Sequence, residues 1–263
     1  VLTLFGMAVG SSVAIVNYIS RIFSPIESLG MEIQTIQSAM AGVKRIDAFL
    51  AQPERIQPPE RGSAARGEVA LSHVTFGYGE KPVLRDFSMT VKEGEQVTLV
   101  GRTGAGKSTV FRLLLGLYRP ESGTVTIGGV DVSEISDRRR RSCIGCVEQH
   151  FSRVPGTVLD QITLSDPDIT EEMAHNAAKL AGIDETILSL PDGYSTLCTD
   201  GMFSQGEWQL LSIARAAAAN PAVLLLDEIT ANLDAETEAR VLAALRRASE
   251  GRPVLSISPR VYE

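Results

Sequence analysis

Residues 101–108 read GRTGAGKS, and this octapeptide constrains the chain more than any other feature. The spacing G-x-x-x-x-G-K-[ST] requires small residues, because the backbone must curl until its N–H groups point toward phosphate oxygens. The apolar residues 96–100 predict a buried strand before the loop, and residues 109–115 predict a helix after it. Strand, loop and helix in this order predict a phosphate-binding loop.

Within this loop the residue types suit a nucleotide and its metal ion. Lys107 can reach the β- and γ-phosphates, and Ser108 can place a hydroxyl on Mg²⁺. The helix that begins at Lys107 adds the positive end of its dipole. The residues expected to cradle the phosphates are Gly101, Arg102, Thr103, Gly104, Ala105, Gly106, Lys107, Ser108 and Thr109.

A second motif lies far along the chain. Residues 222–226, AVLLL, predict a buried parallel strand, and Asp227 and Glu228 follow it directly. A carboxylate at the end of such a strand can hold Mg²⁺ through a water. Glu228 can orient or deprotonate the attacking water. The alternative is that both carboxylates cap the next helix, and it is weaker because the loop already requires a partner for Mg²⁺.

With these two motifs the chain resembles ATP-binding cassette (ABC) proteins, and more narrowly exporter-type half-transporters. Residues 74–78, VTFGY, place Tyr78 where the family has the aromatic ring that stacks on adenine. The alternative for Tyr78 is an ordinary strand aromatic. Residues 146–149, CVEQ, place Gln149 where the family has a glutamine that senses Mg²⁺ and the γ-phosphate and couples to the membrane domain.

The resemblance implies an ATPase whose hydrolysis is coupled to translocation, with ATP and Mg²⁺ as cofactors. It implies that the catalytic residues are Glu228, Lys107 and Gln149. It also implies that Mg²⁺ is bound by Ser108, Gln149 and Asp227. The implied fold is α/β: a P-loop NTPase cassette with a mixed-sheet core, an antiparallel β subdomain and a helical subdomain, preceded by a transmembrane helix with a long cytoplasmic extension.

Residues 203–209, FSQGEWQ, stand where the family has its signature, usually written LSGGQ. Ser204 and Gly206 match, and by resemblance they contact the nucleotide held by the partner subunit. Ser204 is also a good helix N-cap. The departures from the family pattern are Phe203, Gln205 and Glu207. The carboxylate of Glu207 either weakens the contact with a triphosphate or points to solvent.

The end of the chain departs furthest from the family. Residues 231–234, ANLD, resemble the loop that crosses the dimer interface, but Pro259 stands where the family has a histidine that touches the γ-phosphate. Proline has no donor and no titratable group. All three histidines precede Asp227. Either the site hydrolyses ATP poorly or the chain end is abnormal, and we expect a cassette truncated at its C-terminus.

The first twenty residues carry no charge and are long enough to span a membrane. Apolar residues then recur at three- and four-residue steps, which predicts an amphipathic helix: Ile26, Leu29, Ile33, Ile36, Met40 and Val43. By resemblance, residues 1–52 are the last transmembrane helix and its cytoplasmic extension. The alternative is a buried helix of a soluble protein. A Pro-rich linker at 53–66 and the cassette at 67–263 complete the predicted domains.

Within the cassette, turn residues and apolar patterns predict further elements. Residues 68–76 and 83–91 predict strands, and residues 124–132 predict a hairpin with Gly128 and Gly129 at its bend. From 150 to 219 the pattern is mainly helical.

The composition limits the kinds of ligand that we expect this chain to bind. The net charge of −7 argues against nucleic-acid binding, and the arginine run at 138–141 is interpreted as a solvated face. Cys143 and Cys146 are interpreted as small core residues. Cys198 is the only other cysteine, so a zinc site is not expected.

The leading hypothesis is an ATP-hydrolysing subunit of an ABC exporter in the plasma (inner) membrane, with its cassette in the cytoplasm. Its partner is a second half-transporter, in a homodimer or a heterodimer, and the departures favour the heterodimer. A binding-only, regulatory half is the alternative. A soluble ATPase of DNA maintenance shares the two nucleotide motifs but not the apolar first twenty residues.

Overall fold

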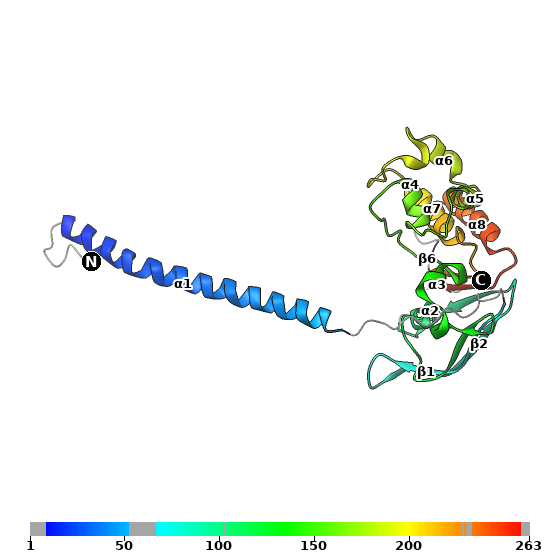
Figure 1. Cartoon of the computed structure of the whole chain (residues 1–263), viewed down its shortest axis with the longest axis horizontal. Helices are drawn as coiled ribbons and strands as arrows, with labels where there is room; N and C mark the ends of the chain where they lie inside the picture. The colour runs from blue at the N-terminus through cyan, green and yellow to red at the C-terminus, as the bar shows by residue number, and fades with distance from the viewer. Residues whose placement is uncertain (1–8, 53–66, 103, 228, 230–232, 259–263) are drawn as a thin grey trace. The chain divides into compact units, whose positions relative to one another are not determined.

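A computed structural model describes residues 9–52, 67–102, 104–227, 229 and 233–258. Backbone contacts divide the chain into two compact units, Val1–Ile56 and Gln57–Glu263. The described part of the first unit is one helix, α1 (Val9–Leu50; Figure 1). The predicted linker, residues 53–66, lies outside the described residues.

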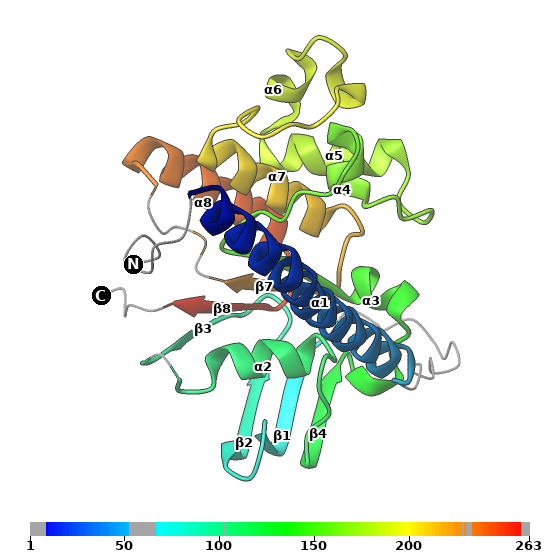
Figure 2. The same ribbon diagram turned by 90° about the vertical axis from the view of Figure 1, so that its left-hand side faces the viewer.

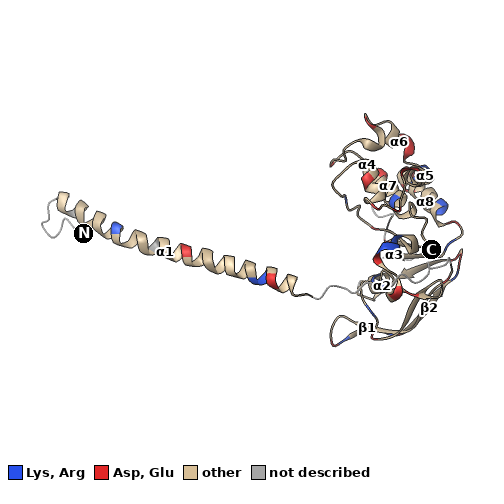
Figure 3. Cartoon of the chain, in the orientation of Figure 1, with Lys and Arg blue, Asp and Glu red and all other residues tan. Residues whose placement is uncertain are grey.

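Helix α1 is 42 residues long and contains Pro25. The predicted stripe from Ile26 to Val43 lies on it, and all six of its side chains are more than half exposed. Charged residues are sparse on the first half of the helix (Figure 3). In the described part of the chain, no helix combines the length and apolarity needed to cross a membrane. Residues 1–8 of the predicted span fall outside that part.

The second unit contains an antiparallel sheet in the order β2-β1-β4-β5. Its strands are β1 (Val69–Gly77), β2 (Pro82–Val91), β4 (Ser122–Ile127) and β5 (Val130–Asp131). The predicted strands and the predicted hairpin are confirmed. Gly128 and Gly129 have φ angles of 57° and 79°, as a two-residue turn with both residues in the left-handed region requires.

A second sheet contains four parallel strands in the order β3-β8-β7-β6. They are β3 (Gln96–Val100), β6 (Ile144–Val147), β7 (Val223–Asp227) and β8 (Val254–Ser258). Alternate residues of β7 enter different cores: Val223 and Leu225 pack with the antiparallel sheet and α2 (Lys107–Leu114), whereas Leu224 and Leu226 pack with the later helices. Helix α2 lies between the two sheets (Figure 2).

The prediction for residues 96–100 is right about the strand and wrong about its burial. The side chains of β3 alternate between exposed and half-buried, and Val100 is 46% exposed. Within the described residues β3 pairs only with β8, so it is an edge strand with neighbours on one side.

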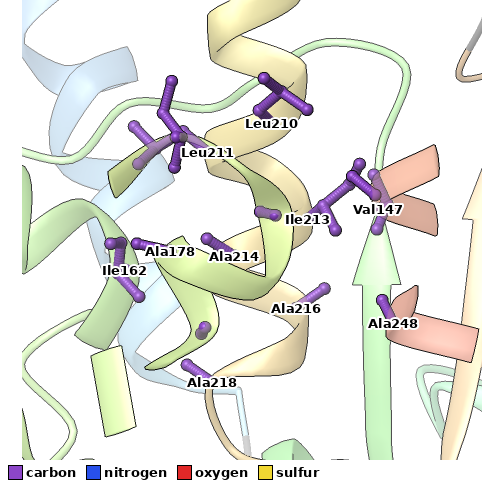
Figure 4. Packing of buried hydrophobic residues seen from close by; sticks show 14 of the residues in the cluster. Val147, Ile162, Ala178, Leu210, Leu211, Ile213, Ala214, Ala216, Ala218 and Ala248 are labelled. Carbon is purple, nitrogen blue, oxygen red and sulfur yellow. The ribbon is translucent and has the colours of Figure 1, made fainter. Parts of the chain in front are cut away.

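The helical part comprises α4 (Val158–Thr163), α5 (Glu171–Ala181), α6 (Asp184–Leu188), α7 (Gln205–Ala217) and α8 (Ala235–Ser249), with a short 3₁₀ turn at Gly193–Ser195. Another 3₁₀ turn, Val132–Glu134, follows β5. Helix α7 is central and packs against α4, α5, α8 and β6. Figure 4 shows Ile213 of α7 beside Val147 of β6, and Ala214 beside Ala178 of α5. Small alanines let these helices pack closely, and the predicted helical region is confirmed.

The arginine run does not form the solvated face that its composition suggests. It lies in α3 (Asp137–Cys143). Arg140 donates from Nη1 to the carbonyl of Leu115, at the end of α2, over 2.7 Å. Arg141 donates from Nη2 to the carbonyl of Ile162, in α4, over 3.0 Å. The last carbonyls of a helix lack intrahelical partners, so these two side chains satisfy helix ends and are half-buried.

Candidate functional site

The nucleotide motifs lie at one edge of the parallel sheet. Register pairs Val100 with Ser258, Asp227 with Ile257 and Val147 with Leu226, so the carboxyl ends of all four strands meet there. The phosphate-binding loop follows β3, Asp227 ends β7, and Gln149 comes two residues after β6. Ligands of parallel α/β sheets bind at this carboxyl edge.

The glycines of the loop have two different physical roles. Gly101, Gly104 and Gly106 have φ angles of 154°, 87° and 92°, a region that other L residues rarely adopt. A Cβ on Gly106 would stand 3.0 Å from Leu84, so this glycine permits close packing on β2. A Cβ on Gly104 would have no atom within 4 Å, so this glycine is required by its backbone conformation and not by close packing.

Lys107 holds the loop in its curled form. Its Nζ donates to the carbonyl of Gly101 over 2.6 Å and to that of Arg102 over 3.2 Å. Because α2 begins at Lys107 behind the left-handed Gly106, its first N–H groups face the loop without a capping side chain. Ser108 is exposed in this first turn. The arrangement provides backbone donors, a cation and a hydroxyl in one place, as an anion site requires.

Tyr78 is anchored beside the same helix with part of its ring free. Its hydroxyl contacts Oγ1 of Thr109 at 3.3 Å and accepts from Nη1 of Arg112 at 3.0 Å. The rings of Phe76 and Tyr118 pack edge-on against it, at centroid distances of 5.0 and 5.2 Å. The side chain of Tyr78 remains 49% exposed. A tyrosine that is anchored by its hydroxyl and by neighbouring rings, and that stays about half exposed, suits base stacking better than core packing.

Asp227 lies close enough to β6 for its charge to affect the next strand. Burial, with the carboxylates of Glu148 and Asp227 as smaller causes, raises the pKa of the Cys146 thiol to about 12. The thiol therefore stays protonated and is a poor metal ligand. Cys143 is buried and Cys146 half-buried, and both pack in the core as predicted. No cluster of three potential metal ligands occurs among the described residues.

Gln149 is tied to the signature helix through its backbone. Nε2 of Gln209, a buried residue of α7, donates to the carbonyl of Gln149 over 2.8 Å. Gln149 itself is half-buried. The structure thus joins the strand end of β6 to the first turns of α7.

The first turn of α7 shows where the carboxylate of Glu207 lies. Ser204 is the N-cap, and its Oγ accepts from the N–H of Glu207. The carboxylate of Glu207 folds back and accepts from the N–H and the hydroxyl of Ser204, both over 2.8 Å. This is a capping box, so the carboxylate binds the N-terminal end of its own helix.

Gly206 is buried against its own chain. A Cβ built on Gly206 would stand 2.1 Å from Cγ2 of Thr237, a residue of α8. The glycine therefore allows α7 and α8 to approach. Asp234, at the end of the predicted interface loop, caps α8 by accepting from the N–H groups of Glu236 and Thr237.

Several predicted site residues lie outside the described residues: Thr103, Glu228, Pro259 and residues 231–232 of the interface loop. The described residues nevertheless fit Mg²⁺, because Ser108 and Asp227 offer hard oxygen donors at one sheet edge. Mg²⁺ usually takes few protein ligands and fills its shell with phosphate oxygens and water, so a dedicated cluster is not needed.

Comparison with known proteins agrees with this geometry. A family model described as ABC transporter matches residues 84–231, which include the phosphate-binding loop, Gln149, the signature segment and Asp227. The chain belongs to the ABC transporter family. Members of this family are ATPases, and this chain includes an ATP-binding domain of the exporter type.

Two curated relatives and one solved structure show the likeness in detail. The ABC transporter ATP-binding protein exp8 of Streptococcus pneumoniae is 34% identical over 261 residues, covering 97% of this chain and 45% of the relative. The fatty acid ABC transporter ATP-binding/permease protein of Mycobacterium bovis is 36% identical over 259 residues, covering 97% of this chain and 41% of the relative. A bacterial Atm1-family ABC exporter with ATP bound aligns with a TM-score of 0.70 at 32% identity, covering 96% of this chain and 45% of that chain. This chain thus spans less than half of these relatives.

Sequence reasoning missed the contacts that four residues make in the structure. Gln209 and Arg140 act on backbone carbonyls that are distant in sequence, and no local pattern announces such partners. Arg215 is similar, since it donates to the carbonyl of Ser152. The capping role of Glu207 had a visible signal, because Ser-x-x-Glu before an apolar run is the pattern of a capping box.

Proposed function

We propose that this chain is the ATPase end of an exporter half-transporter, in which residues 67–263 bind and hydrolyse ATP. Residues 1–52 are the last membrane helix and its cytoplasmic extension, in the plasma (inner) membrane. The observation that carries the proposal is the meeting of the phosphate-binding loop, Asp227 and Gln149 at one carboxyl edge of the parallel sheet. The alignment with a protein named ATP-binding/permease covers 97% of this chain, and this supports the proposal that residues 1–52 belong to a membrane domain.

Each residue has a defined task in this proposal. Tyr78 stacks on adenine, and the loop N–H groups with Lys107 neutralise the phosphates. Ser108, Gln149 and Asp227 would hold Mg²⁺, which would supply positive charge to neutralise the phosphates. Glu228 orients the attacking water and accepts its proton.

The partner is a second half-transporter, whose nucleotide Ser204 and Gly206 approach in the closed pair. The self-capped Glu207 places a negative charge beside Ser204. This disfavours phosphate at the first turn of α7 and supports pairing with a subunit whose own signature is regular. Relatives of comparable identity are named for fatty acids, heavy-metal tolerance and sophorolipid, so the proposal assigns coupling machinery and no cargo.

Calorimetry of the purified chain in detergent tests nucleotide binding. MgATP should release saturable heat from the unmodified chain, and Lys107→Ala should remove it, because the loop loses both its cation and its internal brace. Lys92→Ala, at an exposed turn after β2, is the matched control and should bind normally. Equal heats from the two variants would refute the assignment of the loop.

Measuring ATP turnover distinguishes the binding-only alternative from an active ATPase. In that alternative, Pro259 leaves the γ-phosphate without an imidazole donor, and ATP binds without being hydrolysed. Pro259→His should then restore turnover. If the unmodified chain already hydrolyses ATP and the substitution adds nothing, the alternative is wrong.

A further inference from the structure

The first turn of α7 carries a net negative charge, unlike an ordinary helix N-terminus. Glu207 is the third residue of this helix, and its Oε2 accepts from the N–H and from the hydroxyl of Ser204, both over 2.8 Å. The N-terminus of a helix carries about half a positive elementary charge, whereas an ionised carboxylate carries a full negative one. The sum at this end of α7 is therefore about half a negative charge.

The carboxylate also uses both donors that Ser204 has to offer. The hydroxyl proton and the N–H of Ser204 both point to Glu207. In return, the N–H of Glu207 donates to Oγ of Ser204 over 3.3 Å. Hydrogen bonds to a charged acceptor are stronger than those between neutral groups. A phosphate oxygen that approaches Ser204 must therefore displace a carboxylate that already holds both hydrogen bonds.

The surroundings of this turn leave its charge in place. Within the described part of the chain, the ion pairs join other residues, so no lysine, arginine or histidine there forms one with Glu207. Ser204 and Gln205 are exposed, so the charged cap lies at the surface. Gly206 packs against Thr237 of α8, where even a Cβ would clash, so the other side of the turn is occupied by the chain itself.

We propose that Glu207 is a specificity-determining residue that prevents this chain from completing the ATP site of a second copy of itself. Because the inference rests on the proposed function, the ligand that Ser204 would approach is the nucleotide of the other subunit. In a pair of identical chains, both sites would bring a triphosphate against this carboxylate. Like charges brought together at an interface exclude a partner in this way.

A partner with glutamine in place of Glu207 escapes this repulsion. Glutamine makes the same capping box as glutamate, but without the charge. The first turn of such a partner keeps the positive end of its helix dipole for the nucleotide held by this chain. The inference therefore names the kind of partner: a half-transporter whose residue at this position is uncharged.

Glu207→Gln tests the inference, because the substitution keeps the capping pattern and removes the charge. It is made in the 263-residue chain that also carries Glu228→Gln, so that bound ATP persists. Light scattering measures the molar mass in detergent with and without MgATP, and calorimetry records the binding heat of the same samples. The chain that retains Glu207 should keep its nucleotide-free mass in saturating MgATP. Glu207→Gln should self-associate in MgATP, with an affinity that is higher by roughly 10-fold or more.

Glu172→Gln is the matched control. Glu172 is exposed in the first turn of α5, so this substitution removes the same charge from another helix start and should leave the mass in MgATP unchanged. Binding heat should persist in all three chains. Equal masses in MgATP with and without Glu207→Gln, whether both chains associate or neither does, would overturn the inference alone. Absence of binding heat would overturn the proposed function, and this inference with it.

Discussion

Replacing Gly206 by alanine should destabilise the chain, although alanine is the better helix former. The new Cβ would stand 2.1 Å from Cγ2 of Thr237, far inside van der Waals contact. Thr237 is β-branched and lies in α8, so its χ1 has few alternatives. Overpacking of this kind costs about 1–3 kcal/mol. The gain in helix propensity is about 1 kcal/mol, so a net loss of about 1 kcal/mol is expected.

A second substitution, in Thr237, should relieve the destabilisation caused by Gly206→Ala. Thr237→Ser removes the clashing methyl group, and the next atoms would then lie 3.5 and 3.7 Å from the new Cβ, which is ordinary contact. In this background Gly206→Ala should be neutral or stabilising by up to about 1 kcal/mol. Urea unfolding of the four chains, followed through Trp208 emission, measures both effects. An equal cost of Gly206→Ala in the two backgrounds would refute the packing argument.

Three further predictions concern other sites. Arg140→Met should lower the free energy of unfolding by about 1–3 kcal/mol in urea titrations, because partly buried carbonyls lose a charged donor. Arg138→Met removes only an exposed ion pair and should change the free energy of unfolding by less than about 1 kcal/mol. Tyr78→Leu should weaken ATP binding by roughly 10-fold in calorimetry through loss of stacking, and Tyr78→Phe should not. Hydrogen bonds from the N–H and hydroxyl of Thr157 lower the pKa of Asp160. The contribution of Asp160 to stability is therefore present above the unfolded pKa, about 3.9, and is lost as pH falls through the lower folded pKa. Asp160→Asn should therefore show a weaker loss of stability in acid unfolding curves.

The arrangement of the candidate nucleotide site could largely be predicted because its motifs are contiguous in the sequence. The loop at 101–108 needs glycines at fixed positions, and the apolar run at 222–226 is followed directly by Asp227, so strand ends and candidate ligands coincide in the sequence itself. The meeting of these segments follows from parallel pairing, which places every carboxyl end at one edge.

What could not be predicted depends on contacts between distant residues. The arginine run looks like a solvated face from composition alone, because the open carbonyls that receive Arg140 and Arg141 belong to two other helices. The exposure of β3 depends on its position in the sheet order, which periodicity does not encode. Glu207 is different, since its capping box is local and follows from the spacing to Ser204.

The central claim, that this chain hydrolyses ATP at the edge of its parallel sheet, is tested most directly by turnover with and without the carboxylate after β7. Phosphate release is measured for the unmodified chain and for Glu228→Gln under conditions in which calorimetry shows both to be saturated with MgATP. The account predicts steady turnover in the unmodified chain and a loss of roughly 100-fold or more in Glu228→Gln, as removal of a general base would cause. Equal turnover in both chains would contradict it.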